Sequence, residues 1–293
     1  MIVADLCDRY QFVTLPDHAD LAGQFADHWG GAAARPEPFE SLVLAAYLHD
    51  VGWEAYDRRP RLDEDGEPID FRGMPADPWV PLYEDGIDAV VDLDRYAGLL
   101  VSLHGAGLRN QRYGLSPEWP ETPPEFEAFV DGEQRRQREL FADLLADDTG
   151  DSAGAENPLS PDAETTLAAM HDPGRVPEDD AGRLWDDYRR LQAWDALSLS
   201  FCITESPPGY EEVAAVPGAD GETVTLSVTR ADASEVGGGE FVVDPYPFDT
   251  APLTVTVPVR TVSKDAVGGS GSVARAYYGA RRETRTVRLR AVD

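Results

Sequence analysis

The sequence predicts a mainly α-helical protein with a small appended antiparallel β region. Between residues 16 and 205, apolar residues recur at spacings of three and four, the period of one face of a helix. After Pro207-Pro208-Gly209 the pattern changes to the alternation of half-buried strands, as in "ETVTLSVTR" and "LTVTVPVRTV". The first residues of the chain alternate in the same way, in 2–5 and 10–15. We therefore expect an N-terminal strand pair in 1–15, a helical domain in 16–205 and a C-terminal β region in 210–293. The N-terminal strand pair and the C-terminal strands together would form the β region.

Proline and glycine set the ends of the expected helices. Pro16 opens the first helix, because proline fits the first helical turn, and Gly30-Gly31 ends it. The same periodicity predicts later helices at 38–57, 78–92, 94–108, 125–146 and 178–203. Between them, the composition predicts a proline-rich linker at 116–124 and a flexible acidic insertion at 147–164.

The net charge of the chain indicates which classes of partner and which environment are compatible with the protein. The formal net charge is −30, from 55 acidic and 25 basic residues spread over the whole length. Such a surface is typical of a halophilic, soluble protein and repels nucleic acid. Neither a signal peptide nor a membrane span is indicated, and two cysteines do not make a disulfide framework. We expect a cytoplasmic protein with a small-molecule substrate, no nucleic-acid partner and no membrane partner.

Polar side chains interrupt the apolar faces of four expected helices. Burial of an unpaired charge is costly, so buried charged groups are paired or coordinate metals. Imidazoles and carboxylates are the donors that suit Mn, Fe, Ni, Co or Zn. Each signal is weak alone, because a single histidine on an apolar face is more often a hydrogen-bonded core residue. The polar residues that interrupt these apolar faces are His18, His49, His104 and Asp195, with Asp50 directly after His49.

These residues resemble the motif of the HD-domain superfamily, whose members are all-helical metal-dependent enzymes, mostly phosphohydrolases. "HDVG" is close to the usual His-Asp-hydrophobic-Gly, and a histidine precedes it and an aspartate follows it on other helices. The chain is more similar still to an uncharacterised branch, the domain of unknown function 3891 family. That likeness rests on an ordered set of segments at 17–24, 49–53, 96–104, 129–137, 195–199 and 247–248. The resemblance implies an HD-like helical bundle.

The resemblance also implies one divalent transition metal per chain. Its ligands would be His18, His49, Asp50 and Asp195, and the metal would act as a Lewis acid and activate a water. His104 would contact a second metal or a substrate phosphate. Bimetallic relatives, including diiron oxygenases, place two further histidines after the His-Asp pair. Only His104 has a suitable context here, so a mononuclear site is expected.

Asp50, His104 and Glu54 are the candidate catalytic residues. Glu54 lies one helical turn after Asp50, where it could act as a general base or support a ligand histidine. The plainer interpretation of Glu54 is an exposed helix acid. Gly52 is expected to leave room beside the metal.

Trp53, Arg109 and Arg112 are the candidate substrate-binding residues. The arginines follow His104 in "GAGLRNQRYG", where they could bind an anionic substrate, and Trp53 could form a wall of the pocket. The plainer interpretations are solvated loop arginines and a core tryptophan. His28 and His171 are taken as background, His171 because "AAMHDPGRVPEDD" is typical of a loop.

The sequence thus predicts a metal-dependent hydrolase, above all a phosphohydrolase of a small phosphorylated metabolite or nucleotide. A diiron oxygenase is the first alternative and would need two metals. A non-catalytic binding or regulatory protein with a structural His/Asp core is the second, and would need none. Function belongs to the details of the site, so neither the substrate nor the oligomeric state follows from these patterns.

Overall fold

The structure is a computed structural model of the whole chain. It describes residues 1–30, 35–110, 122–147, 159, 162–172, 182–203, 210–218, 222–231, 238–268 and 272–292. Arg112, residues 116–121 of the predicted linker and most of the predicted insertion at 147–164 lie outside these ranges.

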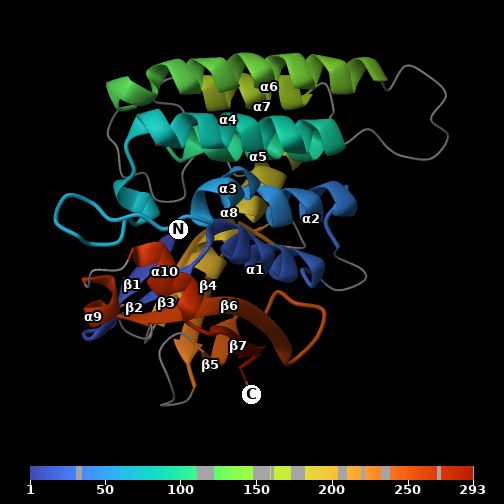
Figure 1. The fold of residues 1–293 in the computed structure, drawn as a ribbon. Coiled ribbons are helices and arrows are strands. Elements are labelled where there is room, and N and C mark those ends of the chain that lie inside the picture. Colours follow the sequence, from blue (N-terminus) through green and yellow to red (C-terminus); the bar gives the residue numbers. More distant parts are fainter. Residues whose placement is uncertain are drawn as a thin grey trace.

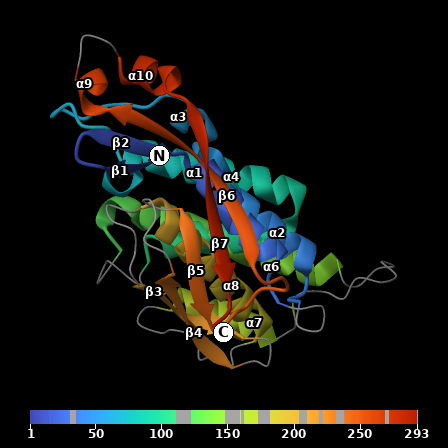
Figure 2. The same ribbon diagram turned by 90° about the horizontal axis from the view of Figure 1, so that it is seen from below.

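A single mixed sheet of seven strands forms one side of the described structure (Figures 1 and 2). The strand order is β1-β2-β6-β7-β5-β4-β3; β5 and β7 run parallel, and the other neighbours are antiparallel. The strands are β1 (Ile2–Asp5), β2 (Arg9–Val13), β3 (Tyr210–Pro217), β4 (Thr223–Arg230), β5 (Gly239–Asp244), β6 (Leu253–Ser263) and β7 (Arg282–Arg290).

The prediction of a mainly α fold with a small antiparallel appendage is therefore wrong, and the protein is mixed α/β. The expected joining of strands from both ends of the chain is confirmed, because β2 pairs with β6, with Tyr10 opposite Val262. Along β6, Val255 and Val257 point inward and join the same hydrophobic core as Phe25 of the first helix. Local alternation shows that these segments are strands. This alternation does not show that the helices pack against the apolar face of these strands.

The helices lie in layers on this sheet, with α1 against the sheet, α4 and α5 further out, and α6 and α7 outermost (Figure 1). Thr14 caps α1 by accepting a hydrogen bond from the Asp17 amide, and Asp94 caps α5 through the Ala97 amide. The helices are α1 (Leu15–Asp27), α2 (Phe39–Leu48), α3 (Glu54–Asp57), α4 (Ala76–Leu93), α5 (Arg95–Gly107), α6 (Glu127–Asp147), α7 (Asp162–His171), α8 (Arg183–Cys202), α9 (Lys264–Val267) and α10 (Val273–Gly279). Short 3-10 turns are η1 (Val51–Trp53), η2 (Phe71–Gly73) and η3 (Pro124–Phe126).

Two local predictions are wrong. The helix expected over 38–57 is broken, because α2 ends at Leu48 and η1 separates it from α3. The last residues of the expected insertion, 162–164, open α7, which continues to His171 where a loop was expected. None of the helices in the described ranges combines the length and the apolar character that a membrane crossing requires.

A chain of hydrogen bonds through buried side chains ties α5, α6 and α7 together. Nε2 of His171 lies 2.7 Å from Oε1 of Gln137. Gln137 donates to the Ser102 hydroxyl at 3.0 Å, and Ser102 donates to Glu133 at 2.7 Å. Ser102, Gln137 and Glu133 are buried, so this chain satisfies polar groups inside the helical layers.

This arrangement predicts that stability falls in acid through His171. Burial, and then the charge of Arg138, lower the pKa of His171 to about 4. The native state thus resists a proton that the unfolded chain accepts below about pH 6.5, so the unfolding free energy falls as the pH drops from 6.5 to 4. We expect wild type to lose about 1 kcal/mol more than His171→Gln between pH 7 and pH 4.5, after allowance for the partial exposure of the ring. Urea unfolding of both proteins measures this, and equal losses would contradict it.

Candidate metal centre

Four side chains from separate elements meet at one buried point. Nε2 of His18, on α1, lies 2.9 Å from Oδ1 of Asp195, on α8. Nε2 of His49, at the end of α2, lies 3.5 Å from the same oxygen and 3.2 Å from Nε2 of His18. Oδ2 of Asp50 lies 3.6 Å from both imidazole nitrogens. Each side chain thus directs one donor atom toward the same small volume.

The other nitrogen of each imidazole fixes which atom faces that volume. Nδ1 of His49 lies 2.9 Å from the carbonyl oxygen of Ala46, so it carries the hydrogen and donates. Nδ1 of His18 lies 2.6 Å from the Ser198 hydroxyl, which itself donates to the Asp195 carbonyl and therefore accepts from His18. In both rings Nε2 is consequently the nitrogen that faces Asp195 and Asp50. The two Nε2 atoms lie 3.2 Å apart beside two carboxylates, and this position suits a proton or a metal ion.

The break after α2 sets the direction of Asp50 relative to His49. Successive residues of a continuous helix point about 100° apart. The chain leaves the helix at Asp50, whose φ is −116° and ψ 19°, and enters the 3-10 turn η1. Asp50 thereby turns toward the donors of α1 and α8. Tyr83, on α4, holds it there by donating its hydroxyl to Oδ1 at 2.8 Å.

The donor spacing fits a single transition-metal ion. A metal–ligand bond near 2.1 Å gives edges of about 3.0 Å in an octahedron and about 3.4 Å in a tetrahedron. Five of the six separations among the four donor atoms, all but that between Asp50 and Asp195, run from 2.9 to 3.6 Å. The side chain of Asp195 is 13% exposed and the imidazoles are almost fully buried, so Asp195 is more accessible to solvent than either imidazole.

The pKa values of the cluster describe the same preference for a cation. Burial would lower the pKa of His49, but the charge of Asp50 and the hydrogen bond and charge of Asp195 outweigh it and raise that pKa to about 9. Burial likewise opposes ionisation of Asp195, but hydrogen bonds from His18 and His49 hold its pKa well below the usual value. A proton or a metal ion in this position is therefore strongly favoured.

His104 completes the wall of the cluster from α5. Its ring centre is 5.0 Å from that of His49, and its Nε2 lies 4.0 Å from Oδ2 of Asp195. Burial lowers the pKa of His104 to about 4, so the ring is neutral at physiological pH. Nδ1 is buried and has no hydrogen-bond partner within the described part of the chain. His18, His49 and Asp195 form one group of potential metal ligands, and His49, Asp50 and His104 form a second group that shares His49.

The family model described as "Protein of unknown function (DUF3891)" matches residues 1–264. The chain belongs to this family. No curated protein and no solved structure matches it. The matched range contains every donor of the cluster, so the family model spans the whole candidate centre of this DUF3891 protein.

Of the residues predicted to act beside the cluster, Trp53 is buried and Glu54 is exposed. Trp53 is buried and packs its ring against Tyr56 and Tyr83, beside the residue that holds Asp50. Glu54 begins α3, is 56% exposed and pairs with Arg58, so the structure does not bring its carboxylate to the converging donors.

Arg109, the one of the two predicted arginines that the structure describes, stacks on aromatic side chains. The guanidinium of Arg109 lies between aromatic rings, 4.3 Å from the centre of Trp79 and 4.2 Å from that of Phe126. This stacking orders the end of α5 just after His104. Arg112 lies outside the described residues.

Tyr83 and Ser198 are the supporting residues that sequence reasoning missed. For each of them the sequence contained an indication of a buried polar contact. Tyr83 follows Trp79 by one helical turn on an apolar face, so its hydroxyl had to find a buried partner. Ser198 follows Asp195 by three residues on α8, which places its hydroxyl beside the Asp195 carbonyl. The identity of the partners depends on packing between helices and not on local pattern.

Proposed function

We propose that this protein is a metal-dependent hydrolase with an HD-like mononuclear centre, acting on a small phosphorylated metabolite or nucleotide. His18, His49, Asp50 and Asp195 are the proposed ligands of one divalent transition metal. The observation that carries the proposal is the convergence of two Nε2 atoms and two carboxylates at metal-like spacing, with both Nδ1 atoms committed elsewhere. Such commitment of the second nitrogen is typical of metal-binding histidines.

The chain would divide the work of hydrolysis between the ligands and His104. When bound, the divalent metal supplies Lewis acidity toward a phosphate oxygen and a lowered pKa for a coordinated water. Neutral His104 stands on the Asp195 side of the cluster, where it can accept a hydrogen bond from the attacking water. Tyr83 keeps one oxygen of Asp50 occupied, so that the other stays directed at the metal. In the overall reaction a P–O bond forms to water, the ester P–O bond breaks, and the alcohol leaves with a proton.

The overlapping second group of His49, Asp50 and His104 keeps a dinuclear oxygenase as the alternative. One imidazole would then have to serve both ions, and within the described residues only His104 adds a new nitrogen. A structural His/Asp core without metal is the remaining alternative. These three hypotheses differ in the number of metal ions that they predict per chain, which is one, two or none.

Elemental analysis of the purified protein, followed by a screen of phosphate esters, tests the proposal. We expect one equivalent of a transition metal and release of inorganic phosphate from at least one ester in Mn²⁺, Ni²⁺ or Mg²⁺. Two equivalents with oxygen consumption would favour the dinuclear alternative. Absence of metal, with thermal stability unchanged by EDTA, would contradict both metal proposals.

A further inference from the structure

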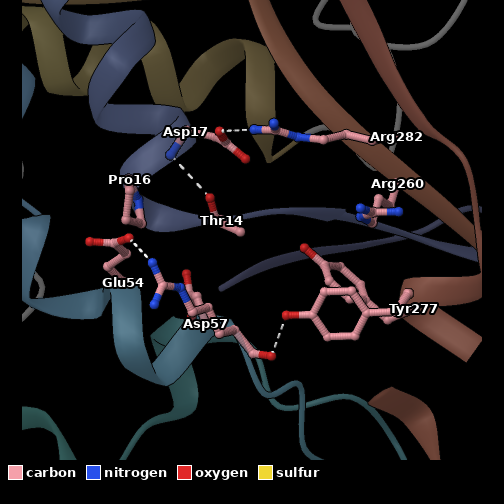
Figure 3. A pocket seen from close by; sticks show the side chains of 10 residues that line it. Thr14, Pro16, Asp17, Glu54, Asp57, Arg260, Tyr277 and Arg282 are labelled. Atoms are coloured by element: carbon pink, nitrogen blue, oxygen red, sulfur yellow. Dashed lines mark hydrogen bonds and ion pairs between the residues drawn. The ribbon is translucent and has the colours of Figure 1, made fainter. Parts of the chain in front are cut away.

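A second cavity, separate from the His/Asp cluster, opens beside the first turn of α1 (Figure 3). Its volume is about 390 Å³, which is within the range of small-ligand pockets. The start of α1 and α3 form one side, and α10 with the adjoining ends of β6 and β7 forms the other. Arg58, Arg260 and Arg282 all line it, although the chain as a whole carries a charge of −30.

Two of the three arginines are already neutralised. Arg282 pairs with Asp17 at 2.7 Å, and Arg58 pairs with Glu54. Asp57, the remaining acid in the wall, is buried and accepts a hydrogen bond from the Leu15 amide at 2.7 Å, besides pairing with the terminal amine. The acids of the cavity are therefore committed to partners in the protein.

Arg260 is the cation that remains. Its guanidinium donates to the carbonyl oxygen of Ala280, and no carboxylate among the described residues pairs with it. In Figure 3 it points from β6 toward Thr14, across the cavity. Its other N–H groups can therefore meet a ligand. A guanidinium is the side chain best suited to hold a carboxylate or a phosphate by paired hydrogen bonds.

Two tyrosine rings lie next to this charge, at an angle of 86° to each other. The guanidinium of Arg260 lies 5.1 Å from the ring centre of Tyr277 and 5.7 Å from that of Tyr278. Tyr277 is buried, and Tyr278 is half exposed with its hydroxyl bonded to the Arg58 carbonyl at 2.6 Å. The rings are thus held in place before a ligand arrives. A cavity of this size also exceeds the needs of a single phosphate ion.

We propose that this cavity binds a small organic oxyanion, a carboxylate or phosphate attached to a planar ring. Arg260 pairs with the oxyanion, and Tyr278 packs against the ring. Asp17 of the cavity directly precedes His18 of the cluster, but none of the four proposed ligands lines the cavity. The site is therefore independent of the metal, and the proposal does not rest on the proposed hydrolase activity.

Calorimetric titration with phenyl phosphate, benzoate and neutral phenol, at constant ionic strength in chloride, tests the proposal. We expect one saturable site per chain for at least one of the two anions. Phenol should bind at least about tenfold more weakly, because it lacks the charge that meets Arg260. The tighter of the two anions identifies the oxyanion as phosphate or carboxylate.

Variants identify the site. Arg260→Gln should weaken binding about tenfold or more, and Tyr278→Ala should weaken it severalfold. Arg275→Gln, an exposed arginine on α10 away from the cavity, should leave it unchanged. Tyr278 is 54% exposed, so its replacement tests the site even if Arg260→Gln does not fold. Binding should also persist in EDTA-treated protein. Absence of saturable binding, equal affinity for phenol, or full affinity in both cavity variants would overturn the proposal.

Discussion

The His49→Ala variant is expected to lose its metal and its hydrolase activity. His49 provides one of the two Nε2 donors and lies near both carboxylates, so its removal leaves Asp50 and Asp195 with one imidazole fewer. Loss of a supporting residue alone costs about 10- to 100-fold in metal affinity, so loss of a ligand should cost more than about 100-fold. Elemental analysis and competition with a chelator measure the affinity, and circular dichroism confirms that the variant is folded.

Two further variants provide a smaller expected loss of metal affinity and a control with no expected loss. Tyr83→Phe removes only the hydrogen bond to Asp50, so we expect a loss of about tenfold in metal affinity with the fold intact. His28→Ala is the matched control, because His28 is 43% exposed and pairs with Asp249 on the surface. It should retain full metal content. Wild-type metal content in both His49→Ala and Asp195→Ala would show that the ion, if present, is bound elsewhere.

The Gly52→Ala variant is expected to be destabilised by at least about 3 kcal/mol, or not to fold. A β-carbon at residue 52 would lie 1.9 Å from the carbonyl oxygen of Leu82, on α4. That oxygen belongs to the backbone, so η1 and α4 would have to separate. Asp50 and Trp53 flank this contact, and the separation would displace Asp50 from the donors. We expect weaker metal binding together with a lower midpoint of urea unfolding.

Gly132→Ala provides the matched control for this substitution. Gly132 lies inside α6, and the nearest atom to a β-carbon there is the end of the Arg135 side chain at 3.7 Å. Alanine should stabilise this helix by about 0.5 to 1 kcal/mol. If Gly52→Ala unfolds at the same urea concentration as wild type, the close contact between η1 and α4 is not present in solution. The finding also corrects the expected role of Gly52, which makes room for α4 and not for the metal.

Local pattern was enough to predict most of the helices and strands near their observed positions. The first helix was expected from Pro16 and begins at Leu15, and the helix expected over 94–108 is observed at Arg95–Gly107. The break at Asp50 was not predictable in this way. An apolar face continues through residues 42–56, whereas the break depends on the approach of Leu82 and on the hydrogen bond from His49 to Ala46.

The inward direction of His18, His49, His104 and Asp195 was also readable from helical periodicity, and all four are buried or nearly so. Their convergence on one point was an expectation that needed the packing of α1, α2, α5 and α8. Glu54 shows the limit of spacing arguments. It was placed one turn after Asp50, but the 3-10 turn intervenes and its carboxylate points to the surface pocket.

By itself, the sequence determined where the elements lie and which polar residues face inward, because both depend on the periods of helix and strand within a short window. Only the tertiary structure decided that the strands form one seven-stranded mixed sheet with β5 and β7 parallel, since pairing between strands far apart in the chain leaves no local trace. It also decided which donors meet, because the distance between atoms on α1, α2 and α8 is set by how tightly those helices pack on that sheet.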